Sequence, residues 1–198
     1  IAYRTGMRKK EILGLKYADI EGMQHGKPSV IVRPNHYRLI KTDNSIREVP
    51  LFALLKPSEL AFFIKFITIN KTQNIQRFIF TLSSSQLPLA DHVPIKLLNL
   101  LYHDIGGSND SRMTFHGLRH TAMTNLALVM QGHPDLVKSL TDYDQDDIKR
   151  IKMGLLGEHI QGQELWYSCA HLFGHLAPDR GFEYYNHTAW LMASYSLS

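Results

Sequence analysis

Hydrophobic positions recur with a helical period along most of this chain, and most regularly between Met113 and Met130. The apolar side chains of that stretch are spaced by four and three residues, so they line one side of a helix: Leu118, Ala122, Leu126 and Val129. Similar patterns predict further helices at Met7–Tyr17, Pro57–Asn70, Val93–Asp104, Glu164–Phe173 and Pro178–His187. The pattern therefore predicts a structure in which helix dominates.

Three runs rich in β-branched residues interrupt this pattern near the N-terminus. They cover Ser29–Arg33, Tyr37–Lys41 and Ile46–Leu51, and short polar segments separate them. Such runs, bounded by Pro, Asn, Asp and Ser, predict strands joined by tight turns. A fourth run, Gln76–Leu82, predicts either a short strand or a buried extended segment. The expected fold class is mainly α with one small antiparallel sheet near the N-terminus, an α+β fold.

Composition narrows the class of protein. The 198 residues are 44% hydrophobic, enough for one sizeable core, so we expect a single domain over residues 1–198. The one cysteine, Cys169, excludes an internal disulfide framework and fits a reducing cytoplasm. The sequence has neither a run long enough to span a membrane nor a signal peptide, so no membrane partner is expected. A net charge of +4 is compatible with a polyanionic partner.

One face of the central helix carries side chains that suit an anion. His116, Arg119 and His120 stand at i, i+3 and i+4, so they lie side by side near the helix start. The guanidinium and the imidazoles supply hydrogen-bond donors there, and the helix N-terminus adds partial positive charge. The plainer alternative is a surface arginine beside a capping histidine, because the H-x-x-R motif is short. The motifs before and after it decide between these interpretations.

Four motifs require one common explanation. They are TGMRKKEILGLKYADI, which contains Arg8; KTDNSIREVPL, which contains Lys41; HGLRHTAMTNLAL, which contains Arg119; and LFGHLAPDRGFEYYNH, which contains His175 and Tyr185. In this order, and with a hairpin predicted around Lys41, the motifs resemble the catalytic domain of tyrosine recombinases, the phage integrase family. The resemblance extends from about residue 3 to residue 188.

The resemblance implies a role for each of these residues. Arg8 and Arg119 match the two arginines that clamp the scissile phosphate, and His116 matches the first histidine of that pocket. His175 matches the second histidine position, and Lys41 matches the lysine that protonates the leaving 5′ oxygen. The implied reaction is site-specific DNA recombination or integration through a 3′-phosphotyrosine, without metal or nucleotide cofactor. The implied partner is double-stranded DNA with specific sites, paired within a recombinase tetramer in the bacterial cytoplasm, as for the integrase of a mobile element.

The chemistry of phosphodiester cleavage fits these residue types. Two guanidiniums can each donate paired, planar hydrogen bonds to the phosphate oxygens on which charge accumulates, and a lysine cannot copy that geometry. The expected nucleophile is Tyr185, because it opens a Y-x-H phrase with His187 and Tyr184 does not. Adjacent residues on a helix diverge by about 100°, so only one of the two tyrosines can enter the pocket. Tyr184 is the alternative nucleophile.

Neighbouring residues have supporting roles or plainer alternatives. Glu11 is interpreted as the brace that holds Arg8, although an ordinary surface ion pair would look the same in sequence. His120 is interpreted as a structural residue beside the pocket. The catalytic lysine position has competitors at Arg38, Lys9 and Lys10. Candidate contacts to the DNA backbone are the basic residues Lys9, Lys10, Arg47 and Arg112, each of which equally suits a solvated surface.

Two other functions and one metal site are alternatives to this interpretation. A type IB topoisomerase-like enzyme shares the chemistry but relaxes DNA as a monomer at no specific site. A DNA-binding regulator keeps the fold without strand cleavage. A zinc site is a further alternative, with Cys169, His171 and His175 as ligands and His187 or Glu183 as the fourth. Zinc would consume His175, which the four motifs already explain, so we expect no metal.

Two features depart from the family pattern. Arg119 and His175 are 56 positions apart (175 − 119), well beyond the usual separation, which indicates an insertion at about residues 131–163. Its acidic cluster makes it a poor DNA contact, so we expect a subunit contact, a regulatory flap or a plain surface excursion. The DNA-clamping N-terminal domain of the family is missing and the chain begins without Met, so we interpret the chain as a fragment.

Overall fold

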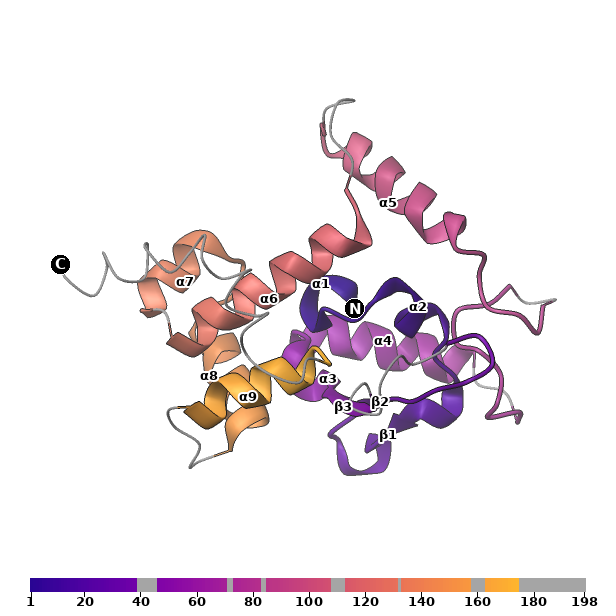
Figure 1. Cartoon of the computed structure of the whole chain (residues 1–198), viewed down its shortest axis with the longest axis horizontal. Coiled ribbons are helices and arrows are strands. Elements are labelled where there is room, and N and C mark those ends of the chain that lie inside the picture. Colours follow the sequence, from indigo (N-terminus) through magenta and orange to yellow (C-terminus); the bar gives the residue numbers. More distant parts are fainter. Residues whose placement is uncertain are drawn as a thin grey trace.

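Helices dominate the structure, a computed structural model that describes residues 1–38, 46–70, 73–82, 85–107, 113–131, 133–157 and 163–174. The short helices of the N-terminal part are α1 (Ala2–Thr5), α2 (Lys9–Leu13), η1 (Tyr17–Asp19), η2 (Met23–His25) and α3 (Leu51–Leu54). The helices that follow are α4 (Pro57–Ile69), α5 (His92–Asp104), α6 (Phe115–Gln131), α7 (Pro134–Leu140), α8 (Gln145–Leu156) and α9 (Gln163–Leu172) (Figure 1). None of these helices is long and apolar enough to cross a membrane.

Within the described residues, the sheet contains three short antiparallel strands in the order β1 (Ile20–Glu21), β2 (Ser29–Val32) and β3 (Arg47–Pro50). The predicted first and third β-branched runs are confirmed as β2 and β3, and the fold class is confirmed with them. The prediction of a strand at 37–41 falls mostly on residues outside the described chain and stays a prediction; among the described residues, β2 pairs directly with β1 on one side and β3 on the other. Tyr37 and Arg38 lie outside any strand, and residues 39–45 lie outside the described chain. β1 has only two residues, too few for a periodic signal.

The helices α4, α5, α6 and α9 begin and end within two residues of their predicted positions, whereas the first predicted helix does not, and α7 and α8 were not predicted. The span 7–17 contains only α2, because Gly14 ends the helix and the chain then becomes extended. Lys16 forms an isolated bridge with Phe78, which is buried together with Ile79. The run 76–82 therefore contributes an isolated bridge and two buried residues, but no strand of the sheet. The predicted helix at 178–187 lies outside the described residues.

The core lies on both sides of α6. Figure 1 shows α7, α8 and α9 grouped around the C-terminal half of α6, while α1 to α4 and the sheet lie towards its other half. Apolar residues from each group are fully or almost fully buried, among them Val30, Val49, Leu126, Ala127, Val129 and Ile151. Gly154 allows α8 to approach α3 closely, since a Cβ at this position would lie 2.3 Å from the Cβ of Ala53.

The segment predicted as an insertion, about residues 131–163, takes part in this core. Leu136 and Val137 of α7 and Ile148 and Ile151 of α8 are all buried. A plain surface excursion would not bury apolar residues from both of its helices. The described part of the segment is therefore an integral layer of the domain. That the segment is an insertion relative to the family stays a prediction.

Candidate active site

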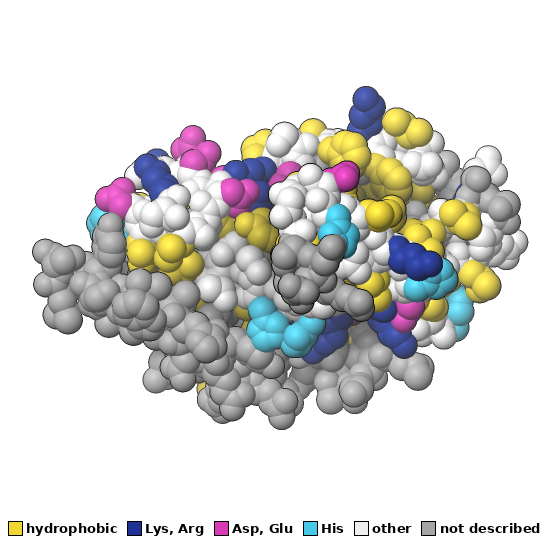
Figure 2. Space-filling view, turned by 90° about the horizontal axis from the view of Figure 1, so that it is seen from above, with side chains coloured by type: hydrophobic (Ala, Val, Ile, Leu, Met, Phe, Trp, Pro, Cys, Tyr) yellow, Lys and Arg dark blue, Asp and Glu magenta, His cyan; other side chains and the backbone are white. Residues whose placement is uncertain are grey.

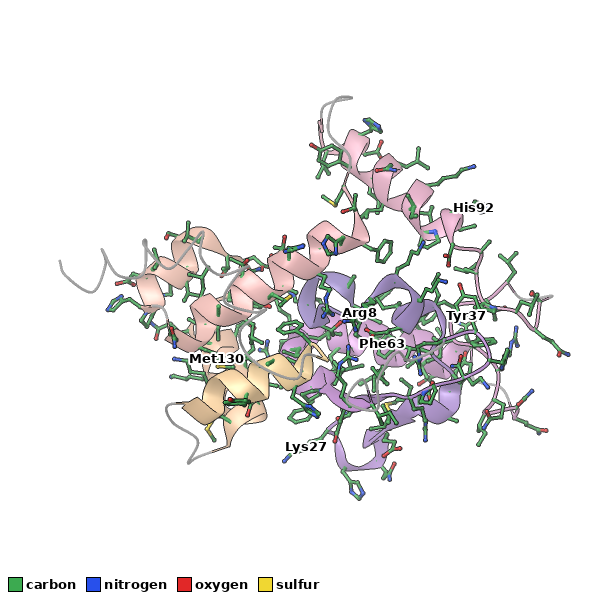
Figure 3. All side chains as sticks on the ribbon, viewed as in Figure 1. Arg8, Lys27, Tyr37, Phe63, His92 and Met130 are labelled. Carbon is green, nitrogen blue, oxygen red and sulfur yellow. The ribbon has the colours of Figure 1, made fainter. Side chains whose placement is uncertain are left out.

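The site begins at the turn between α1 and α2, where Gly6 has a φ of 61°. Glycine is favoured in this left-handed backbone conformation because it lacks a Cβ. A Cβ on Gly6 would lie only 2.4 Å from the ring of Phe173, so the turn also packs tightly against the end of α9. The next residue, Met7, is fully buried, and Arg8 follows as the N-cap of α2, between α1 and α2 in Figure 3. The T-G-x-R motif is thus a tight junction that places Arg8.

Glu11 holds two arginines at once. Its Oε1 accepts hydrogen bonds from Nη1 of Arg8 and Nη1 of Arg47, each at 3.0 Å. Its Oε2 accepts from Nη2 of Arg47 at 2.9 Å and from the backbone N–H of Arg8 at 2.7 Å. Burial by itself raises the pKa of Glu11, but the hydrogen bonds and charges of Arg47 and Arg8 outweigh burial and lower this pKa to about 2. Glu11 is therefore a buried anion that braces Arg8.

Arg47 is buried, and its burial contradicts its predicted role as a contact to the DNA backbone. The exposed fraction of its side chain is 0%. Its Nε donates to the carbonyl oxygen of Leu172 at 2.7 Å, and its two Nη atoms bond the carboxylate of Glu11. Because its Nε and both Nη atoms are bonded inside the protein and its side chain has no exposed surface, Arg47 cannot reach a DNA phosphate here. Arg47 instead joins β3 to α2 and to the end of α9. Sequence reasoning missed this structural role, because Arg47 was selected as a DNA contact on its positive charge alone.

Arg119 ties the central helix to two of the other motifs. Its side chain is buried, its Nη1 donates to the carbonyl oxygen of Gly6, and its Nη2 donates to that of Phe173 at 2.6 Å. The guanidinium carbon also lies 5.6 Å from the centroid of the Phe173 ring, within cation–π range. Gly6 precedes Arg8 by two positions, and Phe173 precedes His175 by two. The contacts of Arg119 therefore bring the surroundings of three motifs together.

His116 and His120 form a pair near the start of α6. Thr114 caps the helix, because its Oγ1 accepts a hydrogen bond from the N–H of Gly117 at 2.9 Å. The Nε2 atoms of the two histidines are 2.7 Å apart, and the ring centroids are 4.2 Å apart. Burial lowers the pKa of His120, and the charges of His116 and Arg119 lower it further. The two histidines thus lie side by side as predicted, whereas Arg119 turns inward.

The other basic residues that were considered for DNA contact or for the catalytic lysine position differ in their contacts and in their exposure to solvent. Lys9 forms an ion pair with Asp91 at 3.3 Å, and the same carboxylate accepts a hydrogen bond from the Tyr37 hydroxyl at 2.7 Å. Lys10 is exposed. Arg38, a competitor for the catalytic lysine position, is buried and donates to the carbonyl oxygens of Arg33 and Glu11, so it is no solvent-exposed cation. Figure 2 shows Lys, Arg and His side chains adjoining along the lower part of one face.

The remaining predicted site residues lie outside the described part of the chain. They are the lysine of the second motif, one candidate DNA contact, the second pocket histidine and the two candidate nucleophiles: Lys41, Arg112, His175, Tyr184 and Tyr185. The described chain ends at Gly174, the residue before His175, with a φ of 69°. A Cβ at Gly174 would lie 3.6 Å from Nη1 of Arg8 and 3.1 Å from Nη1 of Arg47. The approach to His175 therefore passes directly beside the two arginines that Glu11 holds.

The alternative zinc site lies only partly within the described residues. No three His, Cys, Asp or Glu side chains gather there to hold a metal ion. Cys169 is buried, which raises the pKa of its thiol to about 12, while His171 is exposed. The other ligands considered, His175, His187 and Glu183, lie beyond the described chain.

The helical fold with its small sheet and its braced arginines defines the class of protein, a catalytic domain of the tyrosine recombinase type. Residues 1–147 match the model of the phage integrase family, so the chain belongs to that family. A solved structure of the Tn1549 transposon integrase with transposon right end DNA is similar, with a TM-score of 0.55, 16% sequence identity and coverage of 98% of this chain. The same integrase with a circular intermediate DNA gives a TM-score of 0.54 at 17% identity, again over 98% of this chain.

These comparisons establish the fold and the family. At such low identity, the likeness to the solved structures concerns the fold alone. The chain spans 55% of the length of the Tn1549 integrase chain bound to right end DNA and 56% of the one bound to circular intermediate DNA. No curated protein matches the sequence.

Proposed function

We propose that this chain is the catalytic part of a tyrosine-type site-specific DNA recombinase, an integrase that cuts and rejoins double-stranded DNA. The observation that carries the proposal is the pair of hydrogen bonds from Arg119 to the carbonyl oxygens of Gly6 and Phe173. These bonds join segments that adjoin the T-G-x-R, H-x-x-R and G-H motifs. Membership of the phage integrase family and the DNA bound in the Tn1549 integrase structures support a DNA substrate.

In this proposal, Arg8 and Arg119 hold the scissile phosphate. The side chain of Arg8 is 47% exposed, so it can reach a ligand while Glu11 fixes its orientation. A guanidinium carries five N–H donors, so backbone carbonyls can orient Arg119 while other N–H groups face a phosphate. Both arginines stabilise the charge that accumulates on the non-bridging oxygens in the transition state. His116 adds a hydrogen bond at the positive end of α6.

The covalent step requires the C-terminal motif. The phenolate oxygen of Tyr185 attacks the phosphorus, the bond to the 5′ oxygen breaks, and Lys41 supplies the proton to that leaving oxygen. The resulting 3′-phosphotyrosine keeps the energy of the broken bond, so religation by reverse attack needs no nucleotide cofactor. Two DNA sites held by a tetramer of the complete recombinase complete the exchange. The roles of Lys41, His175 and Tyr185 rest on the four sequence motifs.

Covalent trapping tests the proposal. The substrate is a nicked duplex from the junctions of the host element with a bridging 5′-phosphorothiolate at the cut site, because a sulfur leaving group does not religate. Wild-type chain and full-length protein are expected to give a DNA-linked band, which Tyr185→Phe loses and Tyr184→Phe keeps. Arg119→Lys is expected to form the band about 10²–10³-fold more slowly, because the second planar hydrogen bond is lost.

Each other outcome points to a different function or nucleophile. A band that is lost only in Tyr184→Phe would assign the nucleophile to Tyr184. DNA binding by full-length protein without any band would favour the DNA-binding regulator. Relaxation of supercoiled plasmid that lacks the junction sequence would favour a topoisomerase-like enzyme.

A further inference from the structure

The contact between His116 and His120 restricts where the protons of both rings can be. Their Nε2 atoms are 2.7 Å apart and the ring planes are 85° apart. At this distance one nitrogen must donate an N–H and the other must accept with its lone pair. Two imidazolium rings cannot make this bond, because all of their ring nitrogens are donors. The pair therefore holds at most one positive charge while the contact persists.

The two rings have different surroundings. His116 is exposed in the first turn of α6, and His120 is half-buried one turn later. Side chains on a helix lean towards its N-terminus, so His120 leans towards His116 and supports it from behind. Burial and the neighbouring charges of His116 and Arg119 lower the pKa of His120, which favours a neutral His120 ring. The outward ring is thus the one that meets a ligand, and the inner ring is the one that orients it.

When His116 is neutral, a phosphate determines the direction of the hydrogen bond between the rings. Phosphate oxygens only accept hydrogen bonds, so His116 must present an N–H to them. Because its Nε2 is directed at His120, this N–H must be on Nδ1. In a neutral ring that is protonated at Nδ1, the lone pair is on Nε2, and His120 must then be the donor.

We propose that His120 is a positioning residue of the recombination site, whose Nε2–H holds His116 in the Nδ1-protonated tautomer and aims it at the scissile phosphate. This inference rests on the proposed function. It differs from a space-filling role for His120, which any side chain of similar size could take. It also differs from the opposite polarity, in which a charged His116 donates to His120.

Three substitutions of His120 separate these possibilities in single-turnover cleavage of the phosphorothiolate duplex. His120→Gln keeps a donor and is expected to cleave within about threefold of wild type. His120→Met keeps the volume without a donor and is expected to cleave roughly tenfold more slowly at unchanged DNA affinity. His120→Glu can only accept at neutral pH and is expected to be at least as slow as His120→Met.

Two results would overturn the positioning role. Equal rates for His120→Met and His120→Gln would leave only space-filling, and a His120→Glu variant as fast as wild type would establish the opposite polarity. Thr121→Glu controls for the added negative charge, because Thr121 is the exposed neighbour of His120 on α6. The cleavage rate must therefore fall further in His120→Glu than in Thr121→Glu.

Nuclear magnetic resonance of ¹⁵N-histidine-labelled protein reads the tautomer directly, without cleavage. His116 is expected to be protonated at Nδ1 in wild type and His120→Gln, and to populate both tautomers in His120→Met. A His116 ring that is protonated at Nε2 in wild type would overturn the inference even if cleavage occurs. If no covalent adduct forms with any variant, the proposed function fails, and the tautomer measurement still decides the role of His120.

Discussion

At the scale of single residues, the pocket depends on one carboxylate that is shared between two arginines. Glu11 is buried, and both of its oxygens are bonded to Arg47, which has no solvent access, and to Arg8, which does. This difference in exposure explains how one arginine is available to a ligand while the other fixes the geometry. A buried ion pair contributes little net stability, but removal of one partner leaves an uncompensated charge.

We expect Glu11→Gln to lower the free energy of unfolding by roughly 3–5 kcal/mol, because Arg47 would keep a buried charge without an anion. Urea unfolding at neutral pH measures the change. Glu48→Gln is the matched control, since Glu48 is the exposed neighbour of Arg47 on β3. Equal effects of the two substitutions would contradict the bracing role of Glu11.

The same carboxylate predicts a dependence of stability on pH. Its pKa in the folded protein is about 2, below the ordinary value of 4.5. A lowered pKa means that the stabilisation is complete above about pH 4.5 and is lost as the pH falls from there towards 2. Between pH 4.5 and 2, the free energy of unfolding is therefore expected to fall further for the wild type than for Glu11→Gln. Parallel plots of this free energy against pH for the two proteins would contradict the prediction.

At the scale of elements, a charged network ties α1 to the segment that follows α6. Arg4 is buried; its Nε and Nη2 each donate to Glu59 of α4 at 2.9 Å, and its Nη1 donates to Asp142, between α7 and α8, at 2.7 Å. The rings of Tyr3 and Tyr143 have centroids 4.8 Å from its guanidinium carbon. The described part of the predicted insertion is thus fastened to the helix that leads into the T-G-x-R turn.

Asp142→Asn is expected to lower the free energy of unfolding by about 1 kcal/mol, a modest value because this carboxylate is half-exposed and Glu59 still pairs with Arg4. The hydrogen bond from Arg4 lowers the pKa of Asp142 to about 2, from an ordinary value of 3.8, so the contribution disappears as the pH falls through this range. Chemical unfolding at pH 7 measures it. Asp146→Asn, at an exposed position in the same acidic cluster, is the control. A larger loss of unfolding free energy in Asp146→Asn than in Asp142→Asn would contradict the stabilising role of the Arg4–Asp142 ion pair.

At the scale of the whole molecule, packing is uneven. Nine residues of α6 are buried, whereas α5 has none and projects from the body in Figure 1. An apolar groove lies between α5 and α4, and exposed hydrophobic side chains gather on the right half of the face in Figure 2. The exposed large hydrophobic residues on and directly after α5 are Ile95, Leu97, Leu100, Leu101 and Ile105. The fold therefore combines a well-packed site with a loosely attached helix.

This difference in packing predicts that α5 is locally less stable than α6. Backbone amides of α5 are expected to exchange with solvent at least a hundredfold faster than those in the C-terminal half of α6, because none of the residues of α5 is buried. Hydrogen exchange followed by mass spectrometry of the isolated chain measures the rates. Equal protection of α5 and α6 at low protein concentration would show that α5 is held more firmly than its contacts indicate.

The sequence by itself determined features that depend on local periodicity or on residue identity. The positions of α4, α5 and α6 follow from apolar spacing, which each helix carries within its own residues. Arg8, His116 and Arg119 could be selected as site candidates because their motifs occur in a recognisable order. Glu11 could be paired with Arg8 because three positions on a helix are neighbours in space.

The tertiary structure alone decided the features that depend on residues distant in sequence. Arg47 looked like a surface cation, and only the approach of Glu11 and the Leu172 carbonyl, 125 positions away, places it inside the protein. The strand β1 has only two residues and no periodic signal, so only its pairing with β2 identifies it. Arg4 and Asp142 are 138 positions apart, so their ion pair has no local signal. Periodicity reports which side of an element is apolar, whereas the partner on that side is fixed only when the whole chain packs.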